Sequence, residues 1–374
     1  MSLRHGFTTG TAAAAAAKAA TLHLILGQAQ DHVDVPLPRG DRLCIPVLES
    51  RDTGQGIEAA VRKDAGDDPD VTHQAIIRAR VCWERPESGC SALTGQETPV
   101  LLSAGPGVGM VTKPGLPVPV GQPAINPVPQ AQIRKAVAEA LGQALEQAQV
   151  SCAMQVQISV DNGQQLAQRT FNPRLGIVGG ISILGTRGTV KPFSHAAYQA
   201  TIAQSLDVMQ AQGIARPCLT TGGRSERFAV QEFTDLGIEA CVQVADFFFF
   251  AMREAGKRGF SQVLWAVFFG KLIKQAQGHR YTHAHAAQLD LEQLSAWCRD
   301  CGFNKEESRS IARANTAMQV LTEIAAHPRT PALLELLTTR ARFWAQSFAR
   351  SPLRVDYALF DFSGRLLTCT TAHP

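Results

Sequence analysis

The sequence predicts two domains of different class. We expect an α+β domain with glycine- and proline-rich loops over residues 1–192, followed by an α/β Rossmann-like three-layer domain with a mainly parallel sheet over residues 193–374. Three observations predict this. The length of 374 residues suffices for two separate cores. Glycine and proline loops interrupt short strands in the first half. In the second half apolar strands alternate with helices, which is the pattern of a parallel sheet with crossover helices.

The first domain is expected to begin with a helix over residues 12–26, because alanine has the highest helix propensity and Gly27 is a typical residue after a helix end. Thr9 or Thr11 is the expected N-cap. Its remaining elements are inferred from apolar alternation and turn residues. They are strands over 33–37 and 43–48, an amphipathic helix over 130–149, a strand over 154–160, and a hairpin turn at Asp161-Asn162-Gly163.

The first helix of the second domain is expected after Ser194, a good N-cap, and should end before Gly213. Three apolar strands, each followed by a helix, then predict a parallel sheet. The strands cover 218–221, 238–244 and 263–269, and the helices start at residues 225, 246 and 271. Phe247 to Phe250 predict a helix buried on several sides, with a stacking platform as the alternative. Further helices lead to a hairpin over 355–370 that could complete the sheet.

Composition argues against several classes of protein. The net charge is +4 and the pI about 8.6, without a dense basic stripe carrying aromatic residues. This argues against a nucleic-acid partner and fits an anionic small molecule. No apolar segment approaches ~18 residues, and Lys18 interrupts the N-terminal alanine run, so neither a membrane span nor a signal sequence is expected. The nine cysteines lack framework spacing, which predicts reduced thiols in a cytoplasmic protein.

Residues 170–194 contain an unusual amount of glycine around one short apolar run over 181–184. The glycines are Gly176, Gly179, Gly180, Gly185 and Gly188. Repeated glycine indicates backbone at positive φ, or backbone that lies close to something else. Two interpretations remain open at this point. The stretch could be a binding surface made of main chain, or a tight crossover whose glycines let strands pack closely.

Two polar segments of the first domain are candidate binding sites. Free N–H groups at the predicted helix start, together with the hydroxyls of Thr8, Thr9 and Thr11, could bind an anion such as a carboxylate. Helix capping alone would also explain these threonines. Residues 63–70 contain four aspartates, which could bind a hard cation or ribose hydroxyls, or could form a turn that caps the next element of the chain.

Residues 100–109, VLLSAGPGVG, imitate the glycine loop of dinucleotide-binding folds and of many methyltransferases. Such a loop requires a helix next, whereas six prolines come between positions 114 and 129 and forbid that helix. The passage therefore predicts a rigid, preformed loop suited to a large flat ligand, with Lys113 and Asn126 as its polar side chains. A nucleotide-dependent oxidoreductase, which rests on this loop alone, is disfavoured for the same reason.

Four passages carry a resemblance to a known family. They are GFTTGT at 6–11, KDAGDDPDVTH at 63–73, GMVTKPGLPVPVGQPAINPVP at 109–129 and TFNPRLGIVGGISILGTRGTVKPFS at 170–194. Together they resemble the cobalt-precorrin-5B C1-methyltransferase family of the oxygen-independent route to cobalamin, and the likeness runs from about residue 3 to at least residue 289. It implies methyl transfer from S-adenosylmethionine to ring carbon C1 of cobalt-precorrin-5B, which gives cobalt-precorrin-6A. Cobalt would enter only as part of the substrate.

The resemblance and the residue types together nominate site residues. Cationic side chains and helix N-termini would hold the carboxylates of the corrinoid, and glycine loops would let backbone approach the macrocycle. The candidates for substrate or cofactor binding are Thr8, Thr9, Gly10, Thr11, Asp64, Asp67, Asp68, Lys113, Asn126, Arg174, Gly179, Gly180, Gly185, Gly222, Gly270 and Lys271. His283 is the candidate for orienting the corrinoid, approaching its cobalt or acting as a base. Although His279 and His285 lie near it in sequence, no nearby cysteine or carboxylate completes a set, and no protein-bound metal is expected.

The chain departs from the family pattern where Val267-Phe268 replaces a Gly-His pair. Other departures are Ala12, Gln130 and Lys191, where the family has cysteine, arginine and an acidic residue. If the missing histidine were the acid–base group, activity would be impaired. The alternative is then a non-catalytic protein that binds or delivers a corrinoid intermediate. A second copy of the chain or neighbouring pathway enzymes could be further partners, and the location of the methyl-donor pocket is left open.

Overall fold

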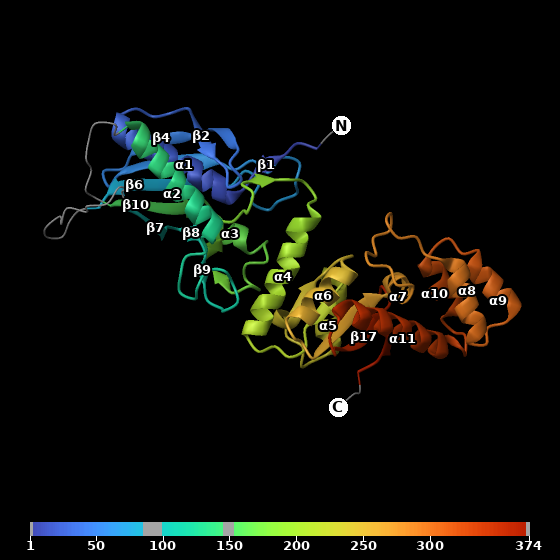
Figure 1. The fold of residues 1–374 in the computed structure, drawn as a ribbon. Coiled ribbons are helices and arrows are strands. Elements are labelled where there is room, and N and C mark those ends of the chain that lie inside the picture. The colour runs from blue at the N-terminus through green and yellow to red at the C-terminus, as the bar shows by residue number, and fades with distance from the viewer. Residues whose placement is uncertain (1–2, 85–98, 145–152, 372–374) are drawn as a thin grey trace. The chain divides into compact units, whose positions relative to one another are not determined.

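The computed structural model describes residues 3–84, 99–144 and 153–371, and the chain divides into two compact units, Met1–Ser194 and His195–Pro374 (Figure 1). Each unit has its own main sheet and its own hydrophobic core. Both units combine helices with a mixed sheet, so the chain is a mixed α/β protein. The Rossmann-like three-layer class of the second domain stays a prediction.

The main sheet of the first unit has five strands. In spatial order they are β4 (Glu49–Asp52), β5 (Ile57–Arg62), β6 (Ile76–Trp83), β10 (Met154–Val160) and β7 (Val100–Ala104). All neighbours pair antiparallel except β10 and β7, which are parallel. Two helices, α1 (Thr9–Leu26) and α2 (Pro127–Ala144), lie side by side on this sheet (Figure 1). The remaining strands of the unit form short two-stranded pairs.

Helix α1 is buried over most of its length because its side chains are small. The alanines from Ala12 to Ala20 have no exposed surface, so the helix can approach both the sheet and α2 closely. The structure corrects the expected cap. Thr8, and not Thr9 or Thr11, is the N-cap, and its hydroxyl oxygen accepts a hydrogen bond from the backbone N–H of Thr11. Gly27 ends the helix in the left-handed conformation, as predicted.

The expected hairpin turn at 161–163 is wrong. Strand β10 is followed by a short helix, α3 (Gly163–Ala167), and within the described residues no return strand pairs with β10, whose neighbours in the sheet are β6 and β7. The physical reason is tertiary packing. A Cβ on Gly163 would lie 2.1 Å from the carbonyl oxygen of Gly107, so the glycine here serves a close approach between α3 and β8 (Gly107–Val108), while Asn162 adopts the left-handed conformation before the helix.

The passage between β7 and α2 behaves as its prolines predict. Its described residues form two very short strands, β8 and β9 (Met110–Val111), and loops, with no helix before Pro127. Helix α2 begins earlier than expected, at Pro127, because proline is tolerated in the first helical turn. Strand β8 pairs with β12 (Gly180–Ile181), and β9 pairs with β11 (Ile177–Val178). The proline-rich passage is thereby tied to the glycine-rich stretch.

Two more short pairs complete the first unit. The expected strands near residues 33–37 and 43–48 are β2 (His32–Pro36) and β3 (Arg42–Pro46), which form an antiparallel hairpin. Strand β1 (Gly6–Phe7) pairs with β13 (Thr189–Val190). This second pair places the start of α1 beside the end of the glycine-rich stretch.

The sheet of the second unit has the spatial order β15 (Cys241–Gln243), β14 (Cys218–Thr220), β16 (Gln262–Phe268), β17 (Arg354–Phe360) and β18 (Leu366–Cys369). The first four strands are parallel, and β18 adds an antiparallel edge, as the predicted final hairpin suggested. Residues Ile238–Ala240 form a 3₁₀ turn where a longer strand was expected.

Helices cover both faces of this sheet. Helix α5 (Gly223–Glu232) packs on one face. The other face contacts α4 (His195–Ala211), α6 (Phe248–Lys257), α7 (Phe269–Ala276) and α11 (Thr330–Ala349). The same core continues into α8 (Leu291–Asp300), α9 (Lys305–Ala312) and α10 (Ala317–Ile324).

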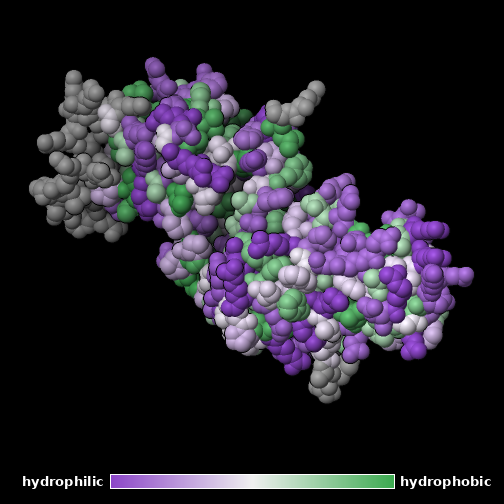
Figure 2. Space-filling model, turned by 45° about the vertical axis from the view of Figure 1, so that its right-hand side comes forward, coloured by the Kyte–Doolittle hydropathy of each residue, from purple (hydrophilic) through white to green (hydrophobic). Residues whose placement is uncertain are grey.

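The phenylalanine run forms the buried helix that its pattern predicted. Phe247 and Phe248 are buried, and Phe249 and Phe250 are half-buried under the guanidinium of Arg253. On the face shown in Figure 2, hydrophobic residues are scattered among hydrophilic ones on both units. None of the helices in the described part of the chain combines the length and apolar character that a membrane span requires.

Candidate functional site

In the first unit, the threonines at the start of α1 hold the glycine-rich stretch in place. The hydroxyl of Thr9 donates to the carbonyl of Ser182 at 3.1 Å and accepts from the N–H of Leu184 at 2.9 Å. The hydroxyl of Thr11 donates to the carbonyl of Gly188 at 2.8 Å. Since these threonines and Thr8 are buried and hydrogen-bonded within the chain, their hydroxyls serve first to position the loop. Direct ligand contact by these hydroxyls stays a prediction.

Most of the glycines in this stretch permit close packing. A Cβ on Gly180 would lie 2.2 Å from the carbonyl oxygen of Gly107, and one on Gly185 would lie 2.4 Å from the hydroxyl of Thr8. Gly10 similarly faces the ring of Pro129. Gly179 differs, because it is exposed, has φ +86°, and has open space where a Cβ would be. The crossover interpretation therefore describes Gly180 and Gly185, whereas Gly179 is exposed and has open space beside it.

Next to Gly179 the surface is apolar. Val178 is 58% exposed and pairs across the β11–β9 ladder with Met110, which is 39% exposed. Two cationic side chains belong to the same segments. The aliphatic part of Lys113 lies against Gly176, and the guanidinium of Arg174 lies 5.8 Å from the ring of Phe171.

Asn126 is half-buried between this surface and α2. Its backbone N–H donates to the carbonyl of Ile183, and its own carbonyl accepts from Gln130 at the start of the helix. The main chain of Asn126 therefore links the glycine-rich stretch to α2, which leaves its side chain as the part that could meet a ligand.

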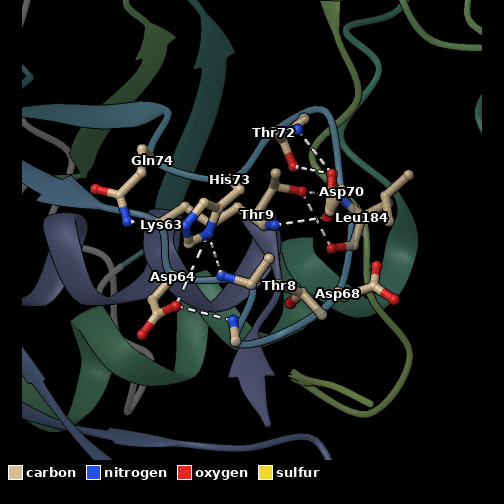
Figure 3. A network of polar contacts seen from close by, with 12 residues as sticks. Thr8, Thr9, Lys63, Asp64, Asp68, Asp70, Thr72, His73, Gln74 and Leu184 are labelled. Carbon is tan, nitrogen blue, oxygen red and sulfur yellow. Dashed lines mark hydrogen bonds and ion pairs between the residues drawn. The ribbon is translucent and has the colours of Figure 1, made fainter. Parts of the chain in front are cut away.

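The aspartates of the acidic segment make hydrogen bonds and ion pairs within the first unit, and Figure 3 shows the contact of Asp64 with His73 and those of Asp70 with Thr72. Asp64 pairs with Arg4 and accepts from the N–H of Gly66, while Asp67 accepts from the backbone N–H of Arg4. Asp68 accepts from the N–H of Phe193 at 2.9 Å. The Arg4 guanidinium, by its hydrogen bond, holds the pKa of Asp64 below its usual value. These contacts favour the turn interpretation over a cation site.

A buried ion pair between the two ends of this segment, residues 63 and 70, was not predicted from the sequence. The ammonium of Lys63, a side chain that is 1% exposed, donates to Asp70 at 2.6 Å. Asp70 also accepts from the N–H and hydroxyl of Thr72 at 2.7 Å each (Figure 3). Burial disfavours the charged carboxylate, but Lys63 and Thr72 outweigh this and lower the pKa of Asp70.

In the second unit, polar groups gather where the parallel strands end. After β14, the N–H of Thr221 donates to the hydroxyl of Ser225, which donates to the carbonyl of Gly222. Gly222 has φ +151° and nothing within 4 Å of a Cβ position. Glu226, a buried residue of α5, accepts from the side-chain amide of Gln243 in β15 at 3.1 Å.

A second group of polar side chains surrounds Asp246, which lies shortly after the end of β15 and directly follows Ala245. Its carboxylate pairs with Lys271 and accepts from the hydroxyl of Thr282 at 3.2 Å. Ala245 has φ +49°, an uncommon value for a residue with a side chain, and its carbonyl accepts from Lys271 at 3.3 Å. Lys274 donates to the carbonyl of Thr282, and burial together with the nearby Lys271 lowers its pKa.

Aromatic rings lie beside this carboxylate. The ring of Tyr281 is 5.1 Å from Phe247 and 5.9 Å from His283, with which it is stacked, and the ring of Tyr198 stacks on Phe247 at 5.4 Å. Burial first, and the charge of Asp246 second, raise the pKa of both tyrosines. His283, the candidate acid–base residue, therefore belongs to an aromatic group next to a carboxylate.

His283 is not part of a metal centre in the described residues. Its Nδ1 accepts from the N–H of His285 at 3.3 Å. Across residues 3–84, 99–144 and 153–371, no three His, Cys, Asp or Glu side chains gather in a way that could hold a metal ion. Gly270 is the remaining candidate of this unit. A Cβ at this position would lie 3.2 Å from the methyl of Ala317, so glycine here allows α7 to approach α10 closely.

The departure at Val267-Phe268 lies at the end of β16. Val267 is buried in the core, and Phe268 contacts the rings of Phe228 and Phe362 with centroid distances of 6.3 and 4.8 Å. Phe268, where the resemblance leads us to expect a histidine, is therefore part of an aromatic contact against α5 in this chain. The sequence did not identify the polar group formed by Asp246, Thr282 and Lys274. Only the predicted strand before Asp246 indicated this part of the chain.

These observations define a class of protein: a mixed α/β chain whose polar and aromatic groups meet at loops and strand ends, as in enzymes that bind small molecules. The chain belongs to the CbiD family. The family model for CbiD matches residues 1–192, and the model for the CbiD C-terminal domain matches residues 281–371.

Named relatives extend this likeness along nearly the whole chain. A cobalt-precorrin-5B C(1)-methyltransferase of Nitratidesulfovibrio vulgaris is 44% identical over 98% of this chain and 92% of its own. The protein of the same name from Polaromonas naphthalenivorans is 43% identical over 97% of this chain and 96% of its own. A crystal structure of the cobalamin biosynthesis protein cbiD from Archaeoglobus fulgidus is 28% identical, with a TM-score of 0.39 over 74% of this chain and 80% of its own.

Proposed function

We propose that this chain transfers a methyl group from S-adenosylmethionine to ring carbon C1 of cobalt-precorrin-5B, giving cobalt-precorrin-6A in cobalamin biosynthesis. The activity for which its near-full-length relatives are named supports the reaction, and the name methyltransferase supports an activated methyl donor. We place the reaction in the cytoplasm, because none of the seven cysteines in the described residues forms a disulfide. A second copy of the chain and neighbouring pathway enzymes remain possible partners within this proposal.

One structural observation supports the choice of substrate most. The exposed apolar pair Met110 and Val178 adjoins the open backbone of Gly179, and the same segments carry Lys113 and Arg174. A corrinoid is a flat ring with peripheral carboxylates, so it needs an apolar surface bordered by cations. Because the prolines and the β9–β11 and β8–β12 pairs fix this surface before binding, little conformational entropy would be lost when the ring binds.

The donor sulfonium supplies a methyl group that is already activated for transfer. The protein must then place the reacting carbon in line with it and exclude water. In this proposal Lys113 and Arg174 orient the ring, the threonines of α1 keep the glycine-rich stretch in its shape, and Asp64, Asp67 and Asp68 fix the N-terminal segment. Asn126 is a further candidate contact to the ring's carboxylates. In the second unit, Lys271 stays a candidate for substrate or cofactor binding, and His283 stays the candidate acid–base residue.

The proposal is tested by titrating the full chain with cobalt-precorrin-5B and following corrinoid absorbance. Lys113→Met should weaken binding about tenfold, or about 1.4 kcal/mol, because a cation facing a carboxylate is lost. Lys135→Met, which removes an exposed cation on α2, is the matched control and should bind like the unaltered chain. Equal affinity for all three proteins would refute the proposed surface.

A second candidate function is suggested by Val267-Phe268. If the family's histidine is required for chemistry, this chain would bind or deliver a corrinoid intermediate without methylating it. Tight corrinoid binding with no affinity for S-adenosylmethionine would favour this alternative. Label transfer from a methyl-labelled donor to the corrinoid would exclude it.

A further inference from the structure

The connections of the second sheet change direction at β14. Helix α5, which comes after β14, packs with Cys218 and Leu264 on one face of the sheet. Helix α7, which comes after β16, packs with Leu219 and Trp265 on the opposite face. Since β15 and β16 flank β14, the loops after β14 and β16 leave toward opposite sides. In open parallel sheets, ligands bind at the carboxyl ends of strands at such a switch point.

An ion pair spans this point. Asp246 lies after β15 and Lys271 lies after β16, so their contact bridges the end of the strand between them. The end of β14 is also tied to this region, because the N–H of Val244 donates to the carbonyl of Thr220 at 2.8 Å. Beside it, Gly222 has open space around the position of a Cβ. A ligand at this point would therefore meet open glycine backbone on one side and a carboxylate on the other.

The carboxylate is held by the fold, and its cationic partner reaches it on a long side chain. The N–H of Thr282 donates to the backbone carbonyl of Asp246 at 3.0 Å, and the Thr282 hydroxyl donates to its side chain. Lys271 reaches the same carboxylate through four rotatable methylene groups. A vicinal diol can supply two hydrogen bonds to one carboxylate and so take the place of the ammonium.

The charge and the rings decide which ligand fits. A carboxylate at the centre repels the peripheral carboxylates of a corrinoid, which disfavours the substrate here. The half-buried ring of Tyr281 beside Asp246 favours a flat base and a cation, and an adenosyl sulfonium has both. The ribose hydroxyls of the same molecule would then face Asp246.

We propose that the carboxyl ends of β14, β15 and β16 bind the adenosine part of the methyl donor, with Asp246 accepting hydrogen bonds from both ribose hydroxyls in place of Lys271. This rests on the proposed function, since it assigns the donor to one place in the second unit. Asp246 is a binding residue in this inference, and Tyr281 provides the ring against which the base or sulfonium lies.

The test is calorimetric titration of the full chain with S-adenosylhomocysteine and with its 2′-deoxy and 3′-deoxy analogues. The unaltered chain should bind each deoxy analogue about tenfold more weakly, because one hydrogen bond to a charged group is lost. Asp246→Asn should weaken S-adenosylhomocysteine binding about tenfold and should no longer distinguish the analogues. Asp235→Asn, which alters an exposed carboxylate paired with Arg216 in the same unit, should change nothing.

Unchanged affinity in Asp246→Asn, or equal binding of all three ligands by the unaltered chain, would overturn the inference and leave the proposed function intact. The analogue comparison needs no variant, so it decides the matter even if Asp246→Asn does not fold. Absence of any S-adenosylhomocysteine binding by the unaltered chain, with and without corrinoid, would instead overturn the proposed donor and this inference with it.

Discussion

The ammonium of Lys63 lies 2.6 Å from the carboxylate of Asp70, and the lysine side chain is 1% exposed. A charge buried to this degree is tolerated only because its partner compensates it. We therefore predict that Asp70→Asn lowers the free energy of unfolding by about 3 kcal/mol, since it leaves the ammonium buried without a counter-charge. Denaturant unfolding measures this. Asp31→Asn, an exposed carboxylate in the same unit, is the control and should have little effect.

The companion variant Lys63→Met should cost less than Asp70→Asn. It removes the buried charge itself, and the aspartate that remains is 27% exposed and keeps its hydrogen bonds from Thr72. If Lys63→Met lowered the free energy of unfolding more than Asp70→Asn did in the same experiment, the cost of burying an uncompensated charge would not be the main effect.

The same pair predicts a dependence on pH. The pKa of Asp70 is lowered in the folded chain, so its contribution is fully present above its unfolded pKa of about 3.9 and is lost as pH falls through the folded pKa. The stability difference between the unaltered chain and Asp70→Asn should be constant from about pH 7 to about pH 5 and should shrink progressively as pH falls below about 4. Urea titrations across this range test it, and a difference that does not shrink below about pH 4 would contradict it.

Neighbouring glycines should respond differently to alanine. In Gly180→Ala the new Cβ would meet backbone of Gly107 at 2.2 Å, so we expect a loss of about 3 kcal/mol. In Gly179→Ala the space is open and only the positive φ is unfavourable, which costs about 1 kcal/mol. Thermal unfolding of the two variants gives the order. Equal losses would show that packing against Gly107 is not what requires glycine at position 180.

The hydroxyl of Thr9 gives a further prediction. Thr9→Val keeps the shape of the side chain but removes its bonds to Ser182 and Leu184, so the free energy of unfolding should fall by about 2 kcal/mol. Thr186→Val, at an exposed position of the same stretch, should be nearly neutral. A neutral Thr9→Val would mean that the hydroxyl does not hold the loop.

Local signals predicted the elements that local energetics determine. Alanine propensity and Gly27 located helix α1, and apolar alternation located β10. The turn at 161–163 was wrong because packing of Gly163 against Gly107, distant in sequence, overrides a hairpin signal. Asp246 was missed as a site residue for a similar reason. A single aspartate after a strand carries no pattern, and only the strand order brings Lys271 to it.

The most direct test of the account is the position of the transferred methyl group. The chain is incubated with cobalt-precorrin-5B and a donor whose methyl carbon is ¹³C-labelled, and the product is examined by carbon NMR. The account predicts a single enriched methyl resonance attached to ring carbon C1. Enrichment at another ring carbon, or an unlabelled corrinoid recovered from protein that demonstrably binds both ligands, would contradict it.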